Sequence, residues 1–348
     1  MQGLRKQSGM AGLGLVLAFM ILSVVVAIAV KESWREHLDM SRYGHRWAGL
    51  QARAYESGAE QLAELALVRD AEQNQSDNLQ EDWAQRLELP TDDGFLQAQL
   101  QDAQAKLNLN SLADPYKVTA QGALLPGAQK YSASQRRFIR LVQAIPLDDE
   151  GTEYYDLQQA EALLDAVKDW IDPDSDVSGF GGAEGDYYSA LDLPLTINNG
   201  PMISVSELRN VREMDPRLYR GLLPYVTALD PAATLNVNTM QGRLAQCFNR
   251  PDDLTPMSVD DGAALLEEIQ LSPLENLQDF SNLPVLATLV GTASGGVSNL
   301  DTSGLGVSSS YFILDSTIAV GDHISKGNSL LMRKDNKAYV IRHSDTNF

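Results

Sequence analysis

The feature that most constrains this chain is an uncharged apolar stretch near its N-terminus. Residues 10–30 contain no acidic or basic side chain. At 1.5 Å of rise per residue they would form about 31 Å of helix, enough to cross the hydrocarbon core of a bilayer. Arg5 and Lys6 precede the stretch and favour a cytoplasmic N-terminus. We therefore expect a single-pass inner-membrane protein whose bulk, residues 31–348, lies in the periplasm.

Three interpretations of this N-terminus are open. A cleaved signal peptide would use Ala27-Ile28-Ala29 as its processing site, but its apolar core is normally shorter than this one. A plain signal anchor would keep the whole chain. A prepilin-type leader would be cut by prepilin peptidase between Gly9 and Met10, and Met10 would then be methylated. The Gly9-Met10 junction favours the third interpretation, with residues 1–9 as leader and residues 10–30 as transmembrane helix.

One position departs from the usual prepilin pattern. Most pilin-like proteins carry glutamate at the fifth mature position, which is Gly14 in this chain. A carboxylate in lipid is costly unless a neighbouring charge pairs with it. A subunit without that carboxylate needs no pairing with a subunit ahead of it, so the sequence suits the first subunit of a filament.

The apolar helix is expected to continue into the soluble part. Residues 31–70 contain no proline. Small and apolar side chains also recur there at spacings of three and four, which is typical of one helix face: Ala48, Ala52, Tyr55, Ala59, Leu62 and Ala66. The pattern predicts a long helix of about 55–60 residues whose second half packs on a globular domain.

The rest of the chain predicts an α+β fold. Gly94–Asp102 alternates apolar and polar residues, as a strand does, and residues 102–112 show the same pattern. Residues 113–233 carry helical patterns and predict a helical domain inserted into a small antiparallel sheet. Residues 31–112 would supply the pilin-like helix and first strands, and residues 234–348 would return to the pilin-like domain.

Further patterns in residues 234–348 support this division into domains. The stretch TLNVNTM at 234–240 mirrors the earlier LNLN at 107–110. A shorter helical pair is predicted at about 257–280, and the Gly, Ser and Thr content of residues 281–306 indicates a loop. The chain should end in strands, with a hairpin turn at Asp335-Asn336.

The strongest candidate site is an acidic loop in the helical domain, DWIDPDSDVSGFGGAEGDYY at 169–188. Carboxylates at spacing two converge when a loop curls, and hard oxygen ligands at that density suit calcium better than magnesium. The loop is not an EF-hand, because Val177 and Ala183 occupy the positions that require Gly and Glu. A solvated acidic turn is the alternative, and Asp169 on the preceding helix would cap or brace the loop.

Composition and motifs restrict the remaining function classes. A net charge of −20 opposes binding to nucleic-acid phosphates. Residues 204–229 look like a helix-hairpin-helix unit, which would suit a receptor for DNA uptake, but the hairpin lacks glycine and a packing role is favoured. The sequence contains no familiar catalytic motif, which disfavours an enzyme. The enzymatic alternative is a membrane-anchored periplasmic hydrolase that uses the acidic loop. The chain has a single cysteine, Cys247, so it cannot form an intrachain disulfide. We expect Cys247 to be a buried apolar residue.

Taken together, these segments resemble the K-type minor pseudopilins of type II secretion systems, the general secretion pathway protein K family. The resemblance covers nearly the whole chain. The stretches that carry it are the Gly9-Met10 junction, DAQAKLNLNSL, DWIDPDSD with GAEGDYY, PMISVSELRNV, LPYVTAL, LNVNTM and SSYFILDSTIAVGDHISKGNSLLMRK.

The resemblance implies a pilin-like fold with a large helical insert, and no enzymatic activity. It implies that calcium binds in the acidic loop, with Asp172, Asp174, Asp176, Glu184 and Asp186 as its ligands. It implies a complex with the I-type and J-type minor pseudopilins at the tip of a filament of the major pseudopilin. There the chain would initiate or cap assembly for the export of folded proteins across the outer membrane.

Overall fold

The computed structural model describes residues 4–291 and 299–344, and for residues 4–12 it describes the helical backbone alone. The first three residues of the predicted leader thus lie outside the described residues. The chain divides into two compact units. One contains Met1–Ser57, Leu89–Leu96 and Thr317–Ser325, and the other contains Gly58–Glu88, Gln97–Ser316 and Lys326–Phe348.

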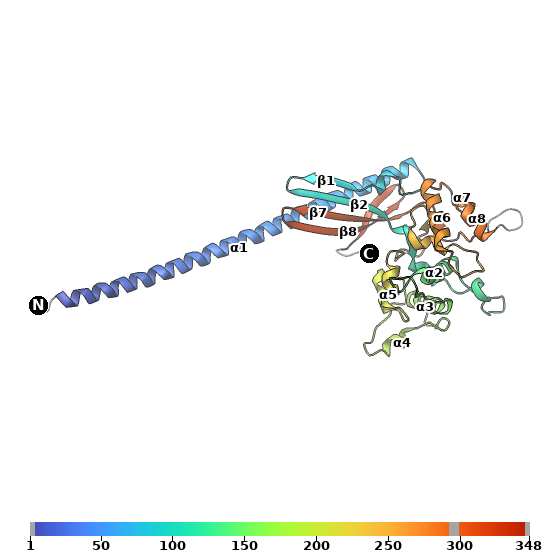
Figure 1. Cartoon of the computed structure of the whole chain (residues 1–348), viewed down its shortest axis with the longest axis horizontal. Coiled ribbons are helices and arrows are strands. Elements are labelled where there is room, and N and C mark those ends of the chain that lie inside the picture. The colour runs from blue at the N-terminus through green and yellow to red at the C-terminus, as the bar shows by residue number, and fades with distance from the viewer. Residues whose placement is uncertain (1–3, 292–298, 345–348) are drawn as a thin grey trace. The chain divides into compact units, whose positions relative to one another are not determined.

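A single helix, α1, runs from Leu4 to Gln73 (Figure 1). Its N-terminal part is long and apolar enough to cross a membrane, and every side chain from Leu13 to Val30 is exposed. The predicted long helix is therefore confirmed, and it continues to Gln73. Of the predicted small-residue stripe, Ala52 and Ala59 are buried, whereas Leu62 is 46% exposed.

The sheet has five strands in the order β1-β2-β7-β8-β9. Their bounds are Leu87–Thr91, Gly94–Asp102, Tyr311–Val320, His323–Lys334 and Lys337–Ser344. Strands β8 and β9 pair antiparallel through the predicted turn, where Asp335 and Asn336 both have positive φ, as a two-residue hairpin turn requires. Because β2 and β7 are neighbours, residues 103–310 form one insertion between adjacent strands, which we call the inserted segment.

The inserted segment is mainly helical and extends past residue 233. Its α-helices are α2 (Ala133–Ala144), α3 (Leu157–Ile171), α4 (Gly185–Ser189), α5 (Pro216–Leu222), α6 (Val259–Leu271), α7 (Leu277–Ser281) and α8 (Pro284–Val290). Helices α6 and α7 confirm the predicted pair at 257–280. Helix α8 lies in the stretch predicted as a loop: Pro284 occupies its first turn, and Leu286 and Val290 are buried.

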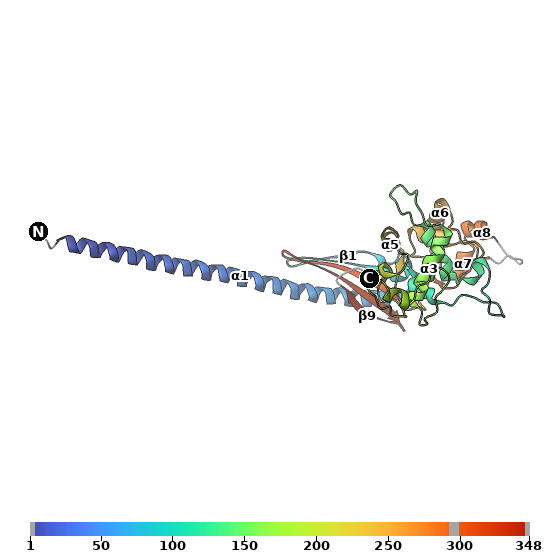
Figure 2. The ribbon, with the colours of Figure 1, turned by 90° about the horizontal axis from the view of Figure 1, so that it is seen from below.

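Capping explains where the two central helices begin. Ser132 with Gln135 and Asp156 with Gln159 form capping boxes at the starts of α2 and α3, and each box satisfies two backbone amides of its helix start. Helices α2 and α3 pack on each other (Figure 1), and α7 packs on α8 (Figure 2). A large apolar core, which includes Phe138, runs through this segment.

The strand predicted at 102–112 is wrong for most of its length. The chain forms short 3-10 turns at Ala103–Ala105 and Leu109–Ala113, and the only strand between them is β3, Leu107–Asn108. The side chains of Asp102 and Asn108 accept hydrogen bonds from the backbone amides two residues later. Such local bonds compete with a sheet ladder and convert an alternating pattern into turns.

The LNLN stretch instead binds distant parts of the backbone through a short strand pair and an asparagine side chain, an arrangement that we call a clasp. Strand β3 pairs in parallel with β4, Val226–Thr227. The side chain of Asn110 both accepts from the amide of Met202, at 2.8 Å, and donates to the carbonyl of the same residue, at 3.0 Å. The amide side chain thus completes the backbone hydrogen bonds of a residue far away in sequence.

The LNVN stretch repeats this arrangement in detail. Strand β5, Leu235–Asn236, pairs in parallel with β6, Leu305–Gly306. Asn238 accepts from the amide of Leu274 and donates to its carbonyl, both at 2.9 Å. The mirrored sequences therefore mark two copies of one structural unit within the inserted segment.

The similarity continues through the helices that follow each clasp. Buried side chains lie six residues after Met202 and after Leu274, at Leu208 and Phe280. Helices α5 and α8 have equal length, both carry proline in the first turn, and both bury their third and seventh residues: Leu218 and Leu222 in α5, Leu286 and Val290 in α8.

Asn238→Ala is expected to destabilise the fold by about 2–4 kcal/mol, because it leaves two buried backbone groups of Leu274 without partners. Urea unfolding of the detergent-solubilised chain, followed by tryptophan fluorescence, measures the loss. Asn282→Ala is the matched control, since Asn282 is exposed and should change stability little. Equal unfolding midpoints for the two variants would show that the clasp contributes nothing.

Candidate metal site in the acidic loop

Helix α3 directs a row of acidic side chains toward the acidic loop. Asp165 and Asp169 lie four residues apart and share one face of the helix, and Asp172 follows three residues later as its C-cap. All three are buried, and Asp169 is fully so. Three buried carboxylates are costly unless other groups compensate their charge.

Two of these carboxylates hold the backbone of the loop. Asp169 accepts the amide of Ser178 at 3.0 Å, and Asp165 accepts the amides of Phe180 and Gly181 at 3.1 and 3.3 Å. At Gly181 a Cβ would lie 2.0 Å from the carbonyl oxygen of Ala162, so only glycine permits this approach. The glycines of the loop thus bring its backbone against α3.

The loop then places Glu184 against the last turn of α3. Asp169, Asp172 and Glu184 each offer an oxygen, and these oxygens lie within 4.8 Å of one another. Among the described residues, one oxygen of Asp172 and both oxygens of Glu184 receive no hydrogen bond although they are buried. Unpartnered buried carboxylate oxygens pointing to one place form a natural site for a hard cation.

The electrostatics support the same conclusion. Burial, together with the charges of Asp169, Asp172 and Asp174, raises the pKa of Glu184 to about 7. Burial also raises the pKa of Asp169 and of Asp172 above their usual range. Lys168 pairs with the other oxygen of Asp172 and donates to the Ser178 hydroxyl at 3.1 Å. Three ionised carboxylates and one ammonium leave two negative charges, which match a divalent cation.

The predicted ligands are brought together only in part. Asp172 and Glu184 lie in the cluster, and Asp174 is close enough for its charge to affect Glu184. Asp176 and Asp186 are exposed and lie outside it. The backbone amide of Asp176 donates a hydrogen bond to the carboxylate of Asp174 in a local turn, and the Asp176 side chain is exposed. Asp186 lies in the first turn of α4, and its side chain is exposed as well.

The sequence interpretation assigned Asp169 a bracing role, and it does accept the Ser178 amide. It is also a member of the cluster. Its spacing of three from Asp172 on a helix was the signal that could have identified it as a ligand.

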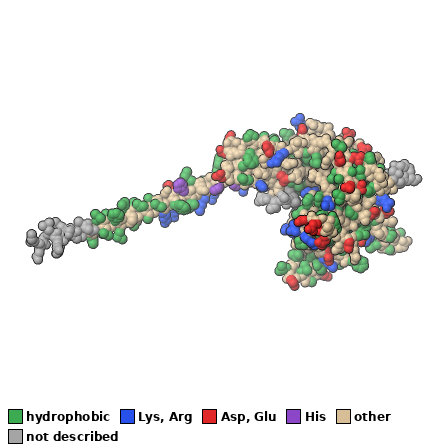
Figure 3. Space-filling view, in the orientation of Figure 1, with side chains coloured by type: hydrophobic (Ala, Val, Ile, Leu, Met, Phe, Trp, Pro, Cys, Tyr) green, Lys and Arg blue, Asp and Glu red, His purple; other side chains and the backbone are tan. Residues whose placement is uncertain are grey.

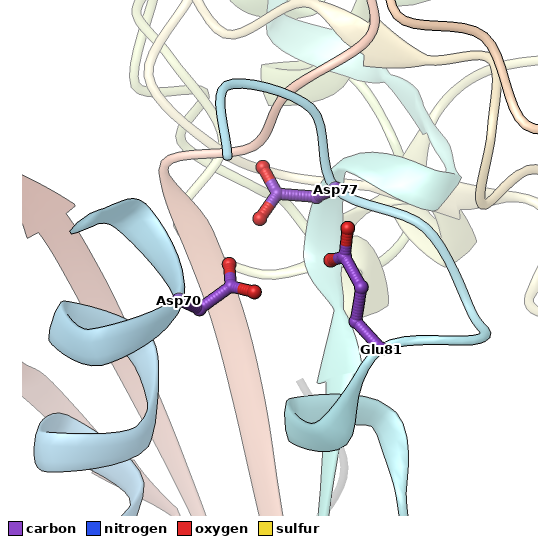
Figure 4. A group of neighbouring side chains, drawn as sticks. All are labelled: Asp70, Asp77 and Glu81. Atoms are coloured by element: carbon purple, nitrogen blue, oxygen red, sulfur yellow. The ribbon is translucent and has the colours of Figure 1, made fainter. Parts of the chain in front are cut away.

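A second acidic cluster, Asp70, Asp77 and Glu81, lies where α1 ends (Figure 4). Protein donors bind each of its three carboxylates. Arg333 of β8 donates to Asp70 at 2.8 Å and to Asp77 at 2.6 Å. The Trp83 indole donates to Glu81 at 2.6 Å. This cluster therefore fastens the end of α1 to the sheet and differs from the acidic loop, where buried oxygens have no partner.

A chain with a long apolar N-terminal helix, a small antiparallel sheet and a helical segment between adjacent strands has the architecture of the pilin-like class. Comparisons with known proteins identify the branch of that class. A family model described as "Type II secretion system (T2SS), protein K" matches residues 105–232.

Curated relatives extend the match along the whole chain. Type II secretion system protein K of Aeromonas hydrophila is 34% identical over 98% of both chains. The protein of the same name from Pectobacterium carotovorum is 30% identical, over 97% of this chain and 96% of its own. The chain belongs to the type II secretion system protein K family.

A solved structure confirms the fold. The similar chain lies in the crystal structure of the GspK–GspI–GspJ complex from the enterotoxigenic Escherichia coli type 2 secretion system. The TM-score is 0.67 at 27% identity, over 87% of this chain and 98% of that chain. The predicted family and the pilin-like α+β fold with a large helical insert are thereby confirmed.

Glu184→Gln is expected to stabilise the metal-free protein at pH 8 by on the order of 1–3 kcal/mol, because a carboxylate with a raised folded-state pKa destabilises the fold when ionised. The advantage should shrink as the pH falls through 7 toward 5, where the native Glu184 becomes protonated. Urea unfolding in EDTA at pH 8 and pH 5.5 measures both values.

Asp186→Asn is the matched control for this comparison, since Asp186 lies two residues away and is exposed. Its stability should follow that of the native chain at both pH values. A Glu184→Gln protein that is less stable than the native chain in EDTA at pH 8 would contradict the crowding of charge at this site.

Proposed function

We propose that this chain is a non-enzymatic minor pseudopilin at the tip of the type II secretion pseudopilus. It assembles with the I-type and J-type minor pseudopilins, and it initiates or caps a filament of the major pseudopilin for export of folded proteins across the outer membrane. The observation that carries the proposal is similarity to protein K along nearly the full length of both chains.

Two features of this chain support a place at the tip. Its transmembrane segment has Gly14 where other pilin-like subunits carry glutamate, so it needs no charge partner in a subunit ahead of it. The inserted segment, residues 103–310, adds a large helical mass to the sheet. A subunit with such a mass suits an end position better than a repeating place in a shaft.

We further propose the membrane topology and processing expected from the sequence. Prepilin peptidase removes residues 1–9, and α1 stays in the inner membrane with its N-terminus in the cytoplasm. The remaining chain lies in the periplasm. The Arg5 and Lys6 charges before the apolar segment support this orientation.

Calcium is the proposed occupant of the acidic loop. Asp169, Asp172 and Glu184 would hold it, and Asp174 adds negative charge nearby. A set made of several carboxylates favours calcium over magnesium, which usually binds one or two carboxylates and keeps several waters. The ion would fasten the loop to α3. The hydrolase alternative is weaker, since carboxylates buried against one another suit a bound ion better than substrate.

Calcium should raise the unfolding free energy of the native chain, by about 2–3 kcal/mol at a hundredfold excess over its dissociation constant, because it binds the folded form alone. Glu184→Gln should lose most of this gain, and Asp186→Asn should keep it. Thermal unfolding in calcium and in EDTA measures the difference. Identical melting curves for the native chain in both conditions would rule out the site.

The assembly role is tested on the chain in native membranes. Mass spectrometry should find a mature N-terminus at methylated Met10. Immunogold labelling should place the chain at one end of assembled filaments, and deletion of its gene should stop both filament assembly and export. A product starting near Val30, or label spread evenly along the shaft, would contradict the proposal.

A further inference from the structure

Helix α2 buries three arginines, Arg136, Arg137 and Arg140, which are 4%, 3% and 3% exposed. We call them the arginine cluster. Figure 3 shows many basic and acidic side chains on the surface of the chain, where water and salt screen their charges. A buried guanidinium lacks that screening, so its charge and its donors need partners inside the protein.

Backbone carbonyls accept part of the hydrogen bonds that the cluster can donate. Arg137 donates to the carbonyls of Asp301 and Ser303, both at 2.7 Å. Arg140 donates to three carbonyls between residues 247 and 253. A guanidinium has more N–H donors than the two bonds that Arg137 makes among the described residues. The cluster therefore holds two segments of the chain on α2 and keeps donors to spare.

The carboxylates near the cluster do not balance its charge. Carbonyl groups carry no net charge, so only ionised groups can do so. Asp301 pairs with Arg136, and Asp301 and Asp253 are the carboxylates that act most strongly on the other two arginines. The Cys247 thiol adds no negative charge near neutral pH, because burial raises its pKa to about 12. Three guanidiniums and two carboxylates leave one positive charge without a partner.

The pKa values of two of the arginines reflect this imbalance. Burial, together with the like charges of neighbouring guanidiniums, lowers the pKa of Arg137 and of Arg140 to about 10. Both side chains still carry a positive charge at neutral pH. A negative charge beside them would favour that charged form and offset the repulsion within the cluster.

A small gap lies among the three arginine side chains. Its volume is about 10 Å³, and its walls also include Phe248, Asn249 and Asp301. The Phe248 ring covers the guanidinium of Arg137, with 5.8 Å between the ring centre and the guanidinium carbon. A volume of this order holds one water molecule or one ion of similar size. Phosphate, sulfate and carboxylate ligands contain several heavy atoms and are too large for it.

We propose that the arginine cluster binds one monovalent anion of the size of chloride in this gap. The anion supplies the missing negative charge and accepts hydrogen bonds from the remaining guanidinium donors, whereas a water molecule would supply no charge. It also strengthens the connection between α2 and residues 301–303. The carbonyl of the next residue, Gly304, accepts the amide of Leu235 at 2.9 Å, so the anion stabilises the clasp formed by the LNVN stretch.

The test measures thermal unfolding of the detergent-solubilised full chain in EDTA, after dialysis into sodium gluconate. Gluconate is too large for the gap, so it serves as the reference salt at equal ionic strength. Replacing it with chloride should raise Tm by about 2–4 °C, and the rise should saturate, because the anion binds the folded form. The folded chain should also broaden the NMR signal of chloride. Equal Tm values in the two salts would overturn the proposal.

Variants locate the response. Arg137→Gln removes the unbalanced charge, so it should reduce the chloride response to below about 0.5 °C whatever its own Tm is. Arg137→Lys keeps a charge at this position and should keep part of the response, which separates loss of charge from loss of packing.

Arg243→Gln is the matched control. Arg243 donates to the carbonyl of Ala144 at the end of the same helix, at 2.8 Å, but does not line the gap. Its variant should keep the whole chloride response. A full response in Arg137→Gln would mean that chloride binds elsewhere, and it would contradict the proposed site.

Discussion

The free-energy cost of an unpaired charge away from water shapes three regions of this chain. The apolar stretch of α1 contains no charge at all, so the membrane segment requires no partner for a buried carboxylate. At the end of α1, Arg333 pairs with both Asp70 and Asp77 within the protein. In the acidic loop, Lys168 compensates only part of the charge, and buried oxygens of Asp172 and Glu184 have no partner among the described residues.

The difference between the two acidic clusters has a simple physical origin. Arginine presents several donors in a rigid fork, and Arg333 uses them to bind two carboxylates and the carbonyl of Ser309 at once. Lys168 is a point charge that contacts one oxygen of Asp172. The first cluster is therefore nearly complete as a structural fastening. The second retains coordination capacity, and this separates a candidate ligand site from a group of acidic residues that merely stabilises the fold.

Periodicity predicted the long helix, strand β2 and the last hairpin, because each is a local pattern in one segment. It failed at residues 102–112, where alternation resembled a strand but the Asp102 and Asn108 side chains bound nearby amides. The mirrored LNLN and LNVN stretches were visible in the sequence, yet their role depends on Met202 and Leu274, which no local pattern connects to them. For the same reason Asp169, on a helix, was not predicted to meet Glu184, on the far side of a glycine loop.

Helix α1 shows how one element can serve three environments without a break. Its first part is apolar on all sides, as lipid requires, and a stripe of small residues such as Ala52 allows close packing later on. Between these parts, large apolar side chains such as Trp47 stand in water on a single side, with arginines beside them. Large apolar side chains exposed along one side of a helix are typical of a contact surface.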